Sequence, residues 1–262
     1  MPEGDTIHKI ANWLAPRLTS DTLQAVTLVG GHDAGVCSGQ RVSGVRAVGK
    51  HLFIELDNRK ALRSHLGMYG SWHFYAHGEA WKKPRRQASI VLETATCTYV
   101  CFNARDVEVV SSPSVRERII DSRLGPDIIA DDVNSETLAR RAFAVMDVDD
   151  LIGDALLDQR VSAGIGNVYK CEVLFMERLH PERPMASLVV RDLVKCFDTA
   201  ARLLRSNLGG GKRVTRANGD GAGRLWVYGR TGLPCLECDT PVAYRRLGRH
   251  HRGTWWCPEC QR

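Results

Sequence analysis

Two Cys-x-x-Cys pairs near the end of the chain constrain its fold more than any other feature. They lie in PCLEC (234–238) and WCPEC (256–260), with eighteen residues between the inner cysteines. This spacing is typical of a four-cysteine zinc site, in which each short turn directs two thiolates at one metal ion. The intervening YRRLGRHHRGTWW can form a hairpin that brings the pairs together. We therefore predict one structural zinc ion per chain, held by Cys235, Cys238, Cys257 and Cys260.

The rest of the composition describes an ordinary globular chain. Its 262 residues suffice for one large domain or two to three small ones, and 44% are hydrophobic against 25% charged, which excludes a disordered chain. The other cysteines are scattered in apolar stretches, where we expect buried side chains: Cys37, Cys97, Cys101, Cys171 and Cys196. No run of eighteen apolar residues occurs, and the acidic N-terminus is unlike a secretion signal. We therefore expect a cytoplasmic protein with no membrane partner.

Positive charge is concentrated at the C-terminal end. The whole chain carries a net charge of +6, but residues 201–262 hold 12 Lys and Arg against 4 Asp and Glu, a balance of +8, so the first 200 residues carry −2. Such an excess beside a metal module favours a polyanionic partner. The hairpin itself is open to two interpretations, a merely soluble hairpin or a fingertip that grips phosphates. Its basic residues are Arg245, Arg246, Arg249, His250, His251 and Arg252.

The hydrophobic pattern divides the chain into three parts. Residues 6–15 have helical periodicity, with Asp5 as N-cap and Pro16 at the end. Up to about residue 110, short runs rich in Val, Ile and Leu predict a β-sandwich or barrel, and helical patterns dominate from there to about residue 208. The expected strands are LQAVTLV, VSGVRAV, HLFIEL, ASIVLE and CTYVCFN. The Gly-rich and basic segment 206–224 is predicted to be a mobile loop or linker.

Residues 156–181, LLDQRVSAGIGNVYKCEVLFMERLHP, predict two helices joined by a glycine-rich turn, and the second of them, VYKCEVLFMERL, is expected to be amphipathic. The N-terminus of the second helix would direct free N–H groups outward, which makes it a site for anions. Asn167 lies at that point, either as an N-cap or as an amide donor to a phosphate.

This segment resembles the helix-two-turns-helix of the Fpg/Nei family of DNA glycosylases. Other motifs follow in the family's order: PEG at 2–4, GKHLFIEL at 49–56, SHLGMYGSW at 64–72, VYGRTGLPC at 227–235 and the four cysteines. The PEG and GMYGSW forms are most similar to the bacterial endonuclease VIII (Nei) branch. The resemblance implies an α+β multidomain fold: a catalytic β-sandwich with a flanking helix (1–112), a helix-two-turns-helix DNA-binding domain with the mobile loop (113–225) and a zinc-finger hairpin (226–262).

The resemblance also implies a role for the first residues. Base excision through an imine needs an unprotonated amine, and a terminal amine has a pKa near 8 against about 10.4 for lysine. Once Met1 is removed, Pro2 would present a terminal secondary amine to the sugar. Glu3 would then be the acid/base group, and Lys50, in the GK turn, would bind the phosphate beside the lesion and assist proton transfer.

Further residues match the family's DNA contacts. His65, Asn167 and Arg252 would grip phosphates around one nucleotide and so favour extrusion of the base. Met68, with Tyr69, would fill the space that the base leaves in the stack, although a core methionine is the plainer interpretation. Two positions depart from the family: Thr6 replaces a glutamate, and Gly153 replaces the lysine of members specific for oxidised guanine. The second departure favours oxidised pyrimidines as the substrate.

The resulting hypothesis is a bifunctional DNA glycosylase/AP lyase of base excision repair, a monomer that acts on damaged DNA in the bacterial cytosol and nucleoid. Strand cleavage would follow base removal by β,δ-elimination. One alternative is a non-catalytic zinc-finger protein that recognises damaged or abasic DNA. Another is a zinc-ribbon protein that acts on RNA or protein, which would show little preference for duplex DNA.

Overall fold

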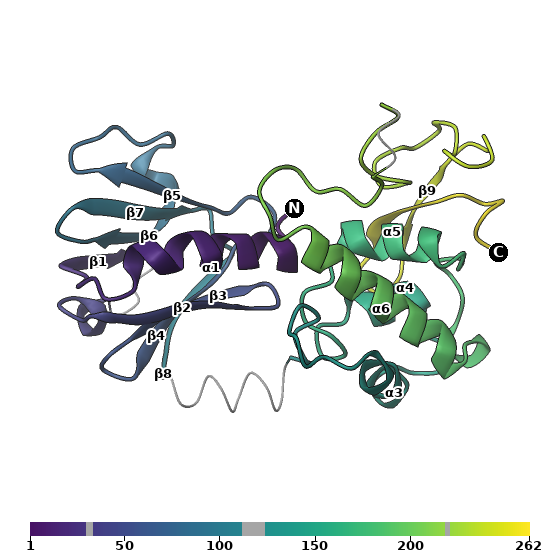
Figure 1. Ribbon diagram of the computed structural model, residues 1–262, viewed down its shortest axis with the longest axis horizontal. Coiled ribbons are helices and arrows are strands. Elements are labelled where there is room, and N and C mark those ends of the chain that lie inside the picture. The colour runs from purple at the N-terminus through teal and green to yellow at the C-terminus, as the bar shows by residue number, and fades with distance from the viewer. Residues whose placement is uncertain (30–33, 112–123, 218–220) are drawn as a thin grey trace. The chain divides into compact units, whose positions relative to one another are not determined.

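A computed structural model describes residues 1–29, 34–111, 124–217 and 221–262. The chain forms two compact units, Met1–Ser122 and Arg123–Arg262 (Figure 1). Each unit has its own hydrophobic core. In the described residues, no helix is long and apolar enough to cross a membrane.

Helix α1 spans Gly4–Leu18 and opens the N-terminal unit. It begins at Gly4, one residue before Asp5, the expected N-cap. Glu3 is the N-cap instead, and Asp5 lies in the first turn, where its negative charge interacts favourably with the helix dipole. It also continues through Pro16 to Leu18. A proline this close to the C-terminus removes one ladder hydrogen bond from the last turn only, so the helix tolerates it. Ile7, Leu14 and Leu18 face the core of the unit.

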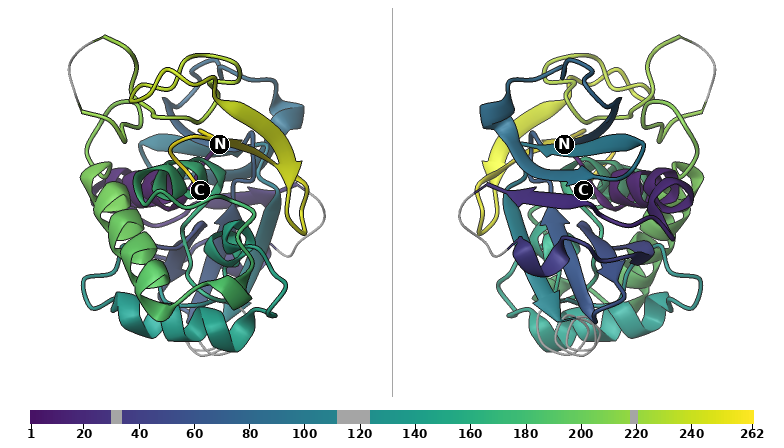
Figure 2. Two further views of the ribbon diagram at one scale, coloured as in Figure 1. Left: turned by 90° about the vertical axis from the view of Figure 1, so that its right-hand side faces the viewer. Right: turned by 90° about the vertical axis from the view of Figure 1, so that its left-hand side faces the viewer.

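The N-terminal unit is a sandwich of two antiparallel four-stranded sheets, as predicted. One sheet has the order β1-β6-β7-β5 and the other β2-β3-β4-β8, with α1 packed against β2 and β3 (Figures 1 and 2). Alternate side chains of both sheets meet in one core, which includes Val26, Leu92, Leu52 and Leu62. The strands are β1 (Ala25–Leu28), β2 (Val42–Val48), β3 (His51–Leu56), β4 (Lys60–His65), β5 (Ser71–Ala76), β6 (Ala88–Glu93), β7 (Cys97–Phe102) and β8 (Asp106–Ser111). The five strands expected from sequence are confirmed.

Short 3₁₀ helices at Gly35–Cys37 and Arg85–Gln87 connect strands of this unit, and a third, Met185–Ser187, lies in the C-terminal unit. The outer face of the first sheet carries a smaller apolar cluster around Tyr75 and Phe102. Trp81, in the connection from β5 to β6, covers this cluster, with its ring 5.8 Å from that of Phe102.

The C-terminal unit is built around helices. They are α3 (Ser135–Val145), α4 (Ile152–Leu157), α5 (Asn167–Met176) and α6 (Val190–Ser206). The core lies between α3, α5 and α6, where α6 buries Leu193, Phe197 and Leu204 (Figure 1). The sequence predicts an amphipathic α5, but the structure buries every residue from Asn167 to Phe175. A helix buried on all sides must satisfy its polar side chains inside the protein, and α5 does so with the segments around it.

The end of the chain forms the predicted hairpin, with β9 (Ala243–Leu247) antiparallel to β10 (Arg252–Trp256). A second small core joins it to α5. There Phe175 packs with Val227 and Val242, and the ring of Trp226 stacks on Phe175 at 5.4 Å. The hairpin is therefore part of the same compact unit as the helices.

Candidate functional site

The predicted site residues fall into two groups, one in each unit. Pro2, Glu3, Lys50, His65, Met68 and Tyr69 belong to the N-terminal unit, while Asn167, Arg252 and the four cysteines belong to the C-terminal unit.

The start of the chain is accessible at its first residues and buried directly after them. Met1 is 41% exposed and Pro2 is half-buried, whereas Glu3 has no exposed surface. Glu3 is fixed by the helix that follows, since its carbonyl accepts the N–H of Thr6 at 2.9 Å and that of Ile7 at 3.2 Å. Sequence and structure thus place an accessible imino acid next to a carboxylate removed from solvent.

Two histidines of adjacent strands come together beside Lys50, which lies in the turn between β2 and β3. The pairing of β3 with β4 sets His51 opposite His65, and their ring centroids are 4.9 Å apart. The pKa of His51 is lowered to about 3, mainly by burial and in addition by the nearby His65, Arg63 and Lys50. Burial also lowers the pKa of His65, against the opposing effect of Asp106. Both imidazoles are therefore neutral at pH 7, and the positive charge of this cluster comes from Lys50 and Arg63.

Arg63 and His51 are members of this cluster that the motif comparison did not identify. Arg63 Nη1 lies 3.0 Å from His51 Nδ1, and since the guanidinium can only donate, His51 accepts through Nδ1. The same guanidinium is held by Glu108 through bonds of 3.0 and 2.7 Å. His51 therefore carries its proton on Nε2. Alternate residues of a strand share one face of the sheet, so this alternation along β3 and β4 is the sequence signal that could have placed both residues beside His65.

The turn between β4 and β5 presents two large apolar side chains to solvent. Met68 is 55% exposed and Tyr69 is 75% exposed, so the plainer interpretation of Met68 as a core residue is wrong. The turn closes through the Gly70 N–H, which donates to the Leu66 carbonyl at 3.0 Å. A Cβ at Gly70 would lie 2.4 Å from that oxygen, so the turn requires glycine there.

In the C-terminal unit, α5 contacts the start of β10 through two polar side chains. Asn167 Nδ2 donates to the Gly253 carbonyl at 2.7 Å, and Lys170 Nζ donates to Thr254 Oγ1 at 2.7 Å. Asn167 is not the N-cap of α5, because Gly166 occupies that position. The structure therefore brings Asn167 within one residue of Arg252 along β10.

Glu172, on α5, is a buried carboxylate that sequence reasoning missed. It accepts the backbone N–H groups of Trp226, Val227 and Tyr228 at 2.7, 3.0 and 2.8 Å, and also the hydroxyl of Thr215. Its acceptor capacity is thus filled by two segments that lie far along the chain. No local pattern marks this role, because a glutamate in a helix is usually a surface residue.

The basic loop 207–224 is closed at its base by Glu172 and by bonds within the loop. The N–H groups of Thr215 and Arg216 donate to the Arg224 carbonyl at 2.9 and 3.1 Å. Asn207 bonds both backbone groups of Val214, at 2.7 and 2.8 Å. The expected mobility of this loop remains a prediction, but its base is attached to the unit and is not a free linker.

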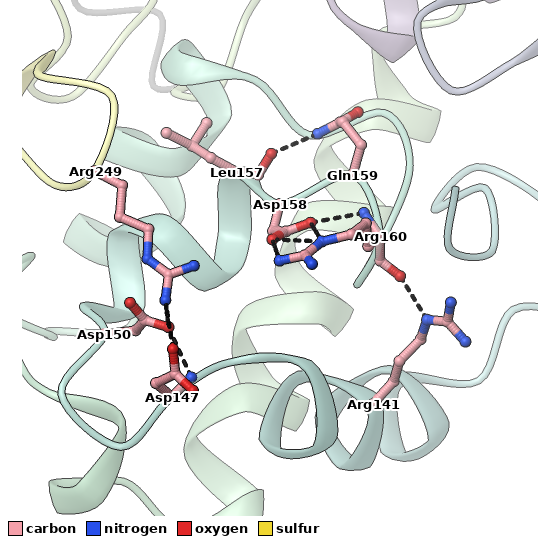
Figure 3. Close-up of polar contacts among 8 residues, drawn as sticks. All are labelled: Arg141, Asp147, Asp150, Leu157, Asp158, Gln159, Arg160 and Arg249. Atoms are coloured by element: carbon pink, nitrogen blue, oxygen red, sulfur yellow. Dashed lines mark hydrogen bonds and ion pairs between the residues drawn. The ribbon is translucent and has the colours of Figure 1, made fainter. Parts of the chain in front are cut away.

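The arginines of the hairpin differ in their partners. Arg245 donates to both carboxylate oxygens of Glu182 at 2.7 Å, and Arg249 is paired with Asp147, at 3.0 Å, and with Asp150. Figure 3 shows Arg249 directed at these two aspartates. Arg252 is exposed and forms no ion pair with the described residues. Of these three arginines, Arg252 is the one whose charge is available to a ligand.

The four cysteines form one cluster, as the spacing predicts. Their sulfur atoms all lie within 4.8 Å of one another, with separations of 3.4 to 3.9 Å for the closer pairs. Tetrahedral coordination with Zn–S bonds of about 2.3 Å requires sulfurs about 3.8 Å apart, so the cluster is suited to a metal ion. Hydrogen bonds, above all from Thr240, lower the pKa of Cys238 to about 6, whereas burial raises the pKa of Cys257 and of Cys260. Of these three thiols, Cys238 is the one that ionises first.

Comparisons with known proteins agree with this architecture. Residues 1–110 match the N-terminal domain of formamidopyrimidine-DNA glycosylase, and residues 124–218 match its H2TH domain. A probable endonuclease 8 2 of Streptomyces coelicolor is 34% identical across the whole of this chain and 94% of its own length. The DNA-(apurinic or apyrimidinic site) lyase Nei2 of Mycolicibacterium smegmatis is 36% identical across the whole chain and 99% of its own length.

A solved structure shares the fold. Lactococcus lactis formamidopyrimidine-DNA glycosylase, bound to DNA with an AP site, superposes with a TM-score of 0.83 at 21% identity over the full length of both chains. The predicted fold is confirmed: a β-sandwich with a helix, a helix-two-turns-helix region and a hairpin with four cysteines.

Proposed function

Because the chain belongs to the Fpg/Nei family of DNA glycosylase/AP lyases, enzymes of base excision repair, we propose that it excises oxidised pyrimidines and cleaves the strand by β,δ-elimination through an imine at Pro2. The observation that carries this proposal is the accessible Met1-Pro2 pair directly ahead of the buried Glu3. Removal of Met1 would convert Pro2 into a terminal secondary amine whose pKa is near 8, so a substantial fraction is unprotonated at neutral pH.

The reaction begins when the Pro2 nitrogen attacks C1′ of the damaged nucleotide and displaces the base. Glu3 donates a proton to the departing base or to the ring oxygen. The ring opens when the attacking nitrogen has lost its own proton and the ring oxygen gains one, because the C1′–O4′ bond then breaks and leaves the iminium. As a carboxylate, Glu3 then accepts protons in the eliminations that expel the 3′- and 5′-phosphates.

Phosphate contacts would hold the damaged nucleotide out of the helix. Lys50 supplies a charge, while the neutral His65 supplies a hydrogen-bond donor. Arg252 adds a second charge, because its guanidinium has no acidic partner among the residues described, and Asn167 adds an amide donor. The exposed Met68 and Tyr69 are suited to filling the space that the base vacates.

The four-cysteine cluster is proposed to bind one structural zinc ion. All four ligand positions are taken by thiolates, which leaves no open position for chemistry, so the ion would stabilise the hairpin without entering the reaction. Gly153 supports the preference for pyrimidines, since it lacks the lysine of guanine-specific relatives. The stem of Lys170 lies beside it, with Cδ 3.6 Å from the position of a Cβ at residue 153.

Covalent trapping with borohydride tests the proposal. The purified protein should form a stable crosslink to duplex DNA that carries an oxidised pyrimidine, and mass spectrometry should show that Met1 has been removed. Pro2→Gly should not crosslink at the wild-type rate, and neither should a form extended by residues ahead of Pro2. Thr6→Ala, a control in the helix that follows Pro2, should crosslink normally. Normal DNA binding without any crosslink would favour the non-catalytic alternative. The same assay with duplexes that carry oxidised purines tests the base preference, since crosslinking to them should be weaker.

A further inference from the structure

Arg252 is exposed, but the backbone around it is held from inside the protein. Lys170 and Thr254 are 2% and 1% exposed, and Lys170 Nζ lies 2.7 Å from Thr254 Oγ1. The ammonium can only donate, so the Thr254 hydroxyl accepts from it. The hydrogen of that hydroxyl is directed to the Arg252 carbonyl at 3.0 Å. A continuous path of donors thus runs from α5 to the backbone of Arg252.

A second bond acts on the next residue. Asn167 Nδ2 donates to the Gly253 carbonyl at 2.7 Å, so two consecutive carbonyls at the start of β10 are bound by side chains: that of Gly253 directly from α5, and that of Arg252 through the Thr254 hydroxyl. Hydrogen bonds in a buried chain of this kind polarise and strengthen one another. Arg252 itself has no ion pair with described residues, so these backbone bonds act on it by fixing the direction in which its side chain leaves the strand.

We propose that Lys170 is a positioning residue: through Thr254 it fixes the backbone of Arg252, so that the guanidinium is presented to a DNA phosphate before DNA binds. This inference rests on the proposed function, in which Arg252 grips a phosphate. Its physical basis is preorganisation, since a side chain already ordered in the free protein loses less entropy on binding.

The test measures binding of the zinc-loaded full chain to a duplex with a tetrahydrofuran abasic-site analogue. The variants are Lys170→Met, which keeps the buried stem without the ammonium, and Thr254→Val, which keeps the shape without the hydroxyl. Thr254→Ser, which retains the hydroxyl, is the matched control. Each of these three variants is made both in the wild-type background and together with Arg252→Ala. Zinc content and thermal unfolding are measured for every protein.

We expect Lys170→Met and Thr254→Val to weaken binding roughly fivefold, the worth of one net hydrogen bond, and Thr254→Ser to bind normally. With Arg252→Ala, neither variant should weaken binding further, because a positioning residue acts only through the group it positions. Equal weakening in both backgrounds would show a merely structural role and overturn the inference. If Lys170→Met does not retain zinc, Thr254→Val carries the test alone.

Two further outcomes separate this inference from the proposed function. If Arg252→Ala weakens binding and lowers its salt dependence while Thr254→Val changes nothing, the inference is wrong and the phosphate contact stands. If Arg252→Ala itself leaves binding unchanged, the phosphate contact fails and the positioning role fails with it.

Discussion

The two units place their candidate functional residues in different ways. In the N-terminal unit, Lys50, His51 and His65 come from one turn and the adjacent strands β3 and β4. In the C-terminal unit, the contacts that hold Arg252 join residues 84 and 86 positions apart, Lys170 with Thr254 and Asn167 with Gly253. A cluster built from a hairpin needs only local register, whereas a cluster built across the unit needs both the helices and the hairpin to be folded.

This difference should be visible in how each unit depends on metal. Chelation of zinc should unfold the hairpin and abolish DNA binding, because zinc binding supplies on the order of ten kcal/mol to a module of this kind. The β-sandwich should remain folded, since its core contains none of the four ligands. Hydrogen exchange, read separately over residues 34–111 and 226–262, measures both effects.

A pair of cysteine variants controls for the chemistry of the chelator. Cys238→Ser removes a ligand and should lose zinc, whereas Cys97→Ser, in β7 of the sandwich, should retain it. If the hairpin remained protected from hydrogen exchange after zinc is lost, the two units would not differ in their dependence on metal.

The same contrast explains what the sequence could predict. The strands β2, β3, β6 and β7 follow from local periodicity, and the cysteine cluster follows from spacing alone. The role of Glu172 could not be predicted, because its partners Thr215 and Trp226 lie 43 and 54 residues away. The burial of α5 was missed for the same reason. The sequence pattern predicts that its polar residues are exposed to solvent, because the pattern does not show that the loop and the hairpin cover them.

Glu172→Gln should produce the next largest effect. The amide keeps the size of the carboxylate but directs two N–H groups toward a site where backbone N–H groups already point. We expect the free energy of unfolding of the C-terminal unit to fall by about 3 kcal/mol, as for the loss of hydrogen bonds to a buried charge. Denaturant unfolding, with hydrogen exchange at residues 215 and 226–228, measures this loss.

The same substitution at an exposed position provides the control. Glu182→Gln removes a carboxylate that pairs with Arg245 at the surface, and its effect should stay below about 1 kcal/mol. If both variants behave alike, the buried contacts of Glu172 do not stabilise the unit, and the contrast between the units loses its main energetic support.

A smaller effect, confined to the N-terminal unit, should appear on acidification. His51 has a pKa of about 3 in the folded state against 6.5 as its ordinary value, so between these values the unfolded chain binds the additional proton. Stability is therefore fully present above about pH 6.5 and falls as the pH decreases toward 3. The decrease should be about 1 kcal/mol per pH unit below about pH 6.

His51→Phe should make this pH dependence shallower, because phenylalanine keeps the ring but cannot bind the proton. Urea unfolding of the N-terminal unit at pH 7, 6 and 5, for the wild type and the variant, measures the difference. Equal slopes for both proteins would mean that His51 is not held neutral by its burial and by the groups that face it, which are His65, Arg63 and Lys50.

The smallest expected effect concerns Arg245, and it separates the arginines that hold the hairpin from Arg252, which is proposed to bind DNA. Arg245→Gln and Arg252→Gln remove the same charge from neighbouring positions of one hairpin. Because Arg245 is already paired with Glu182 at the surface, its loss should change stability by less than about 1 kcal/mol and leave the salt dependence of DNA binding unchanged. Arg252→Gln should lower the slope of log K against log salt by about 0.9, the value for one phosphate contact. Equal changes in slope would show that DNA binding responds to the total charge of the hairpin and not to the position of one arginine.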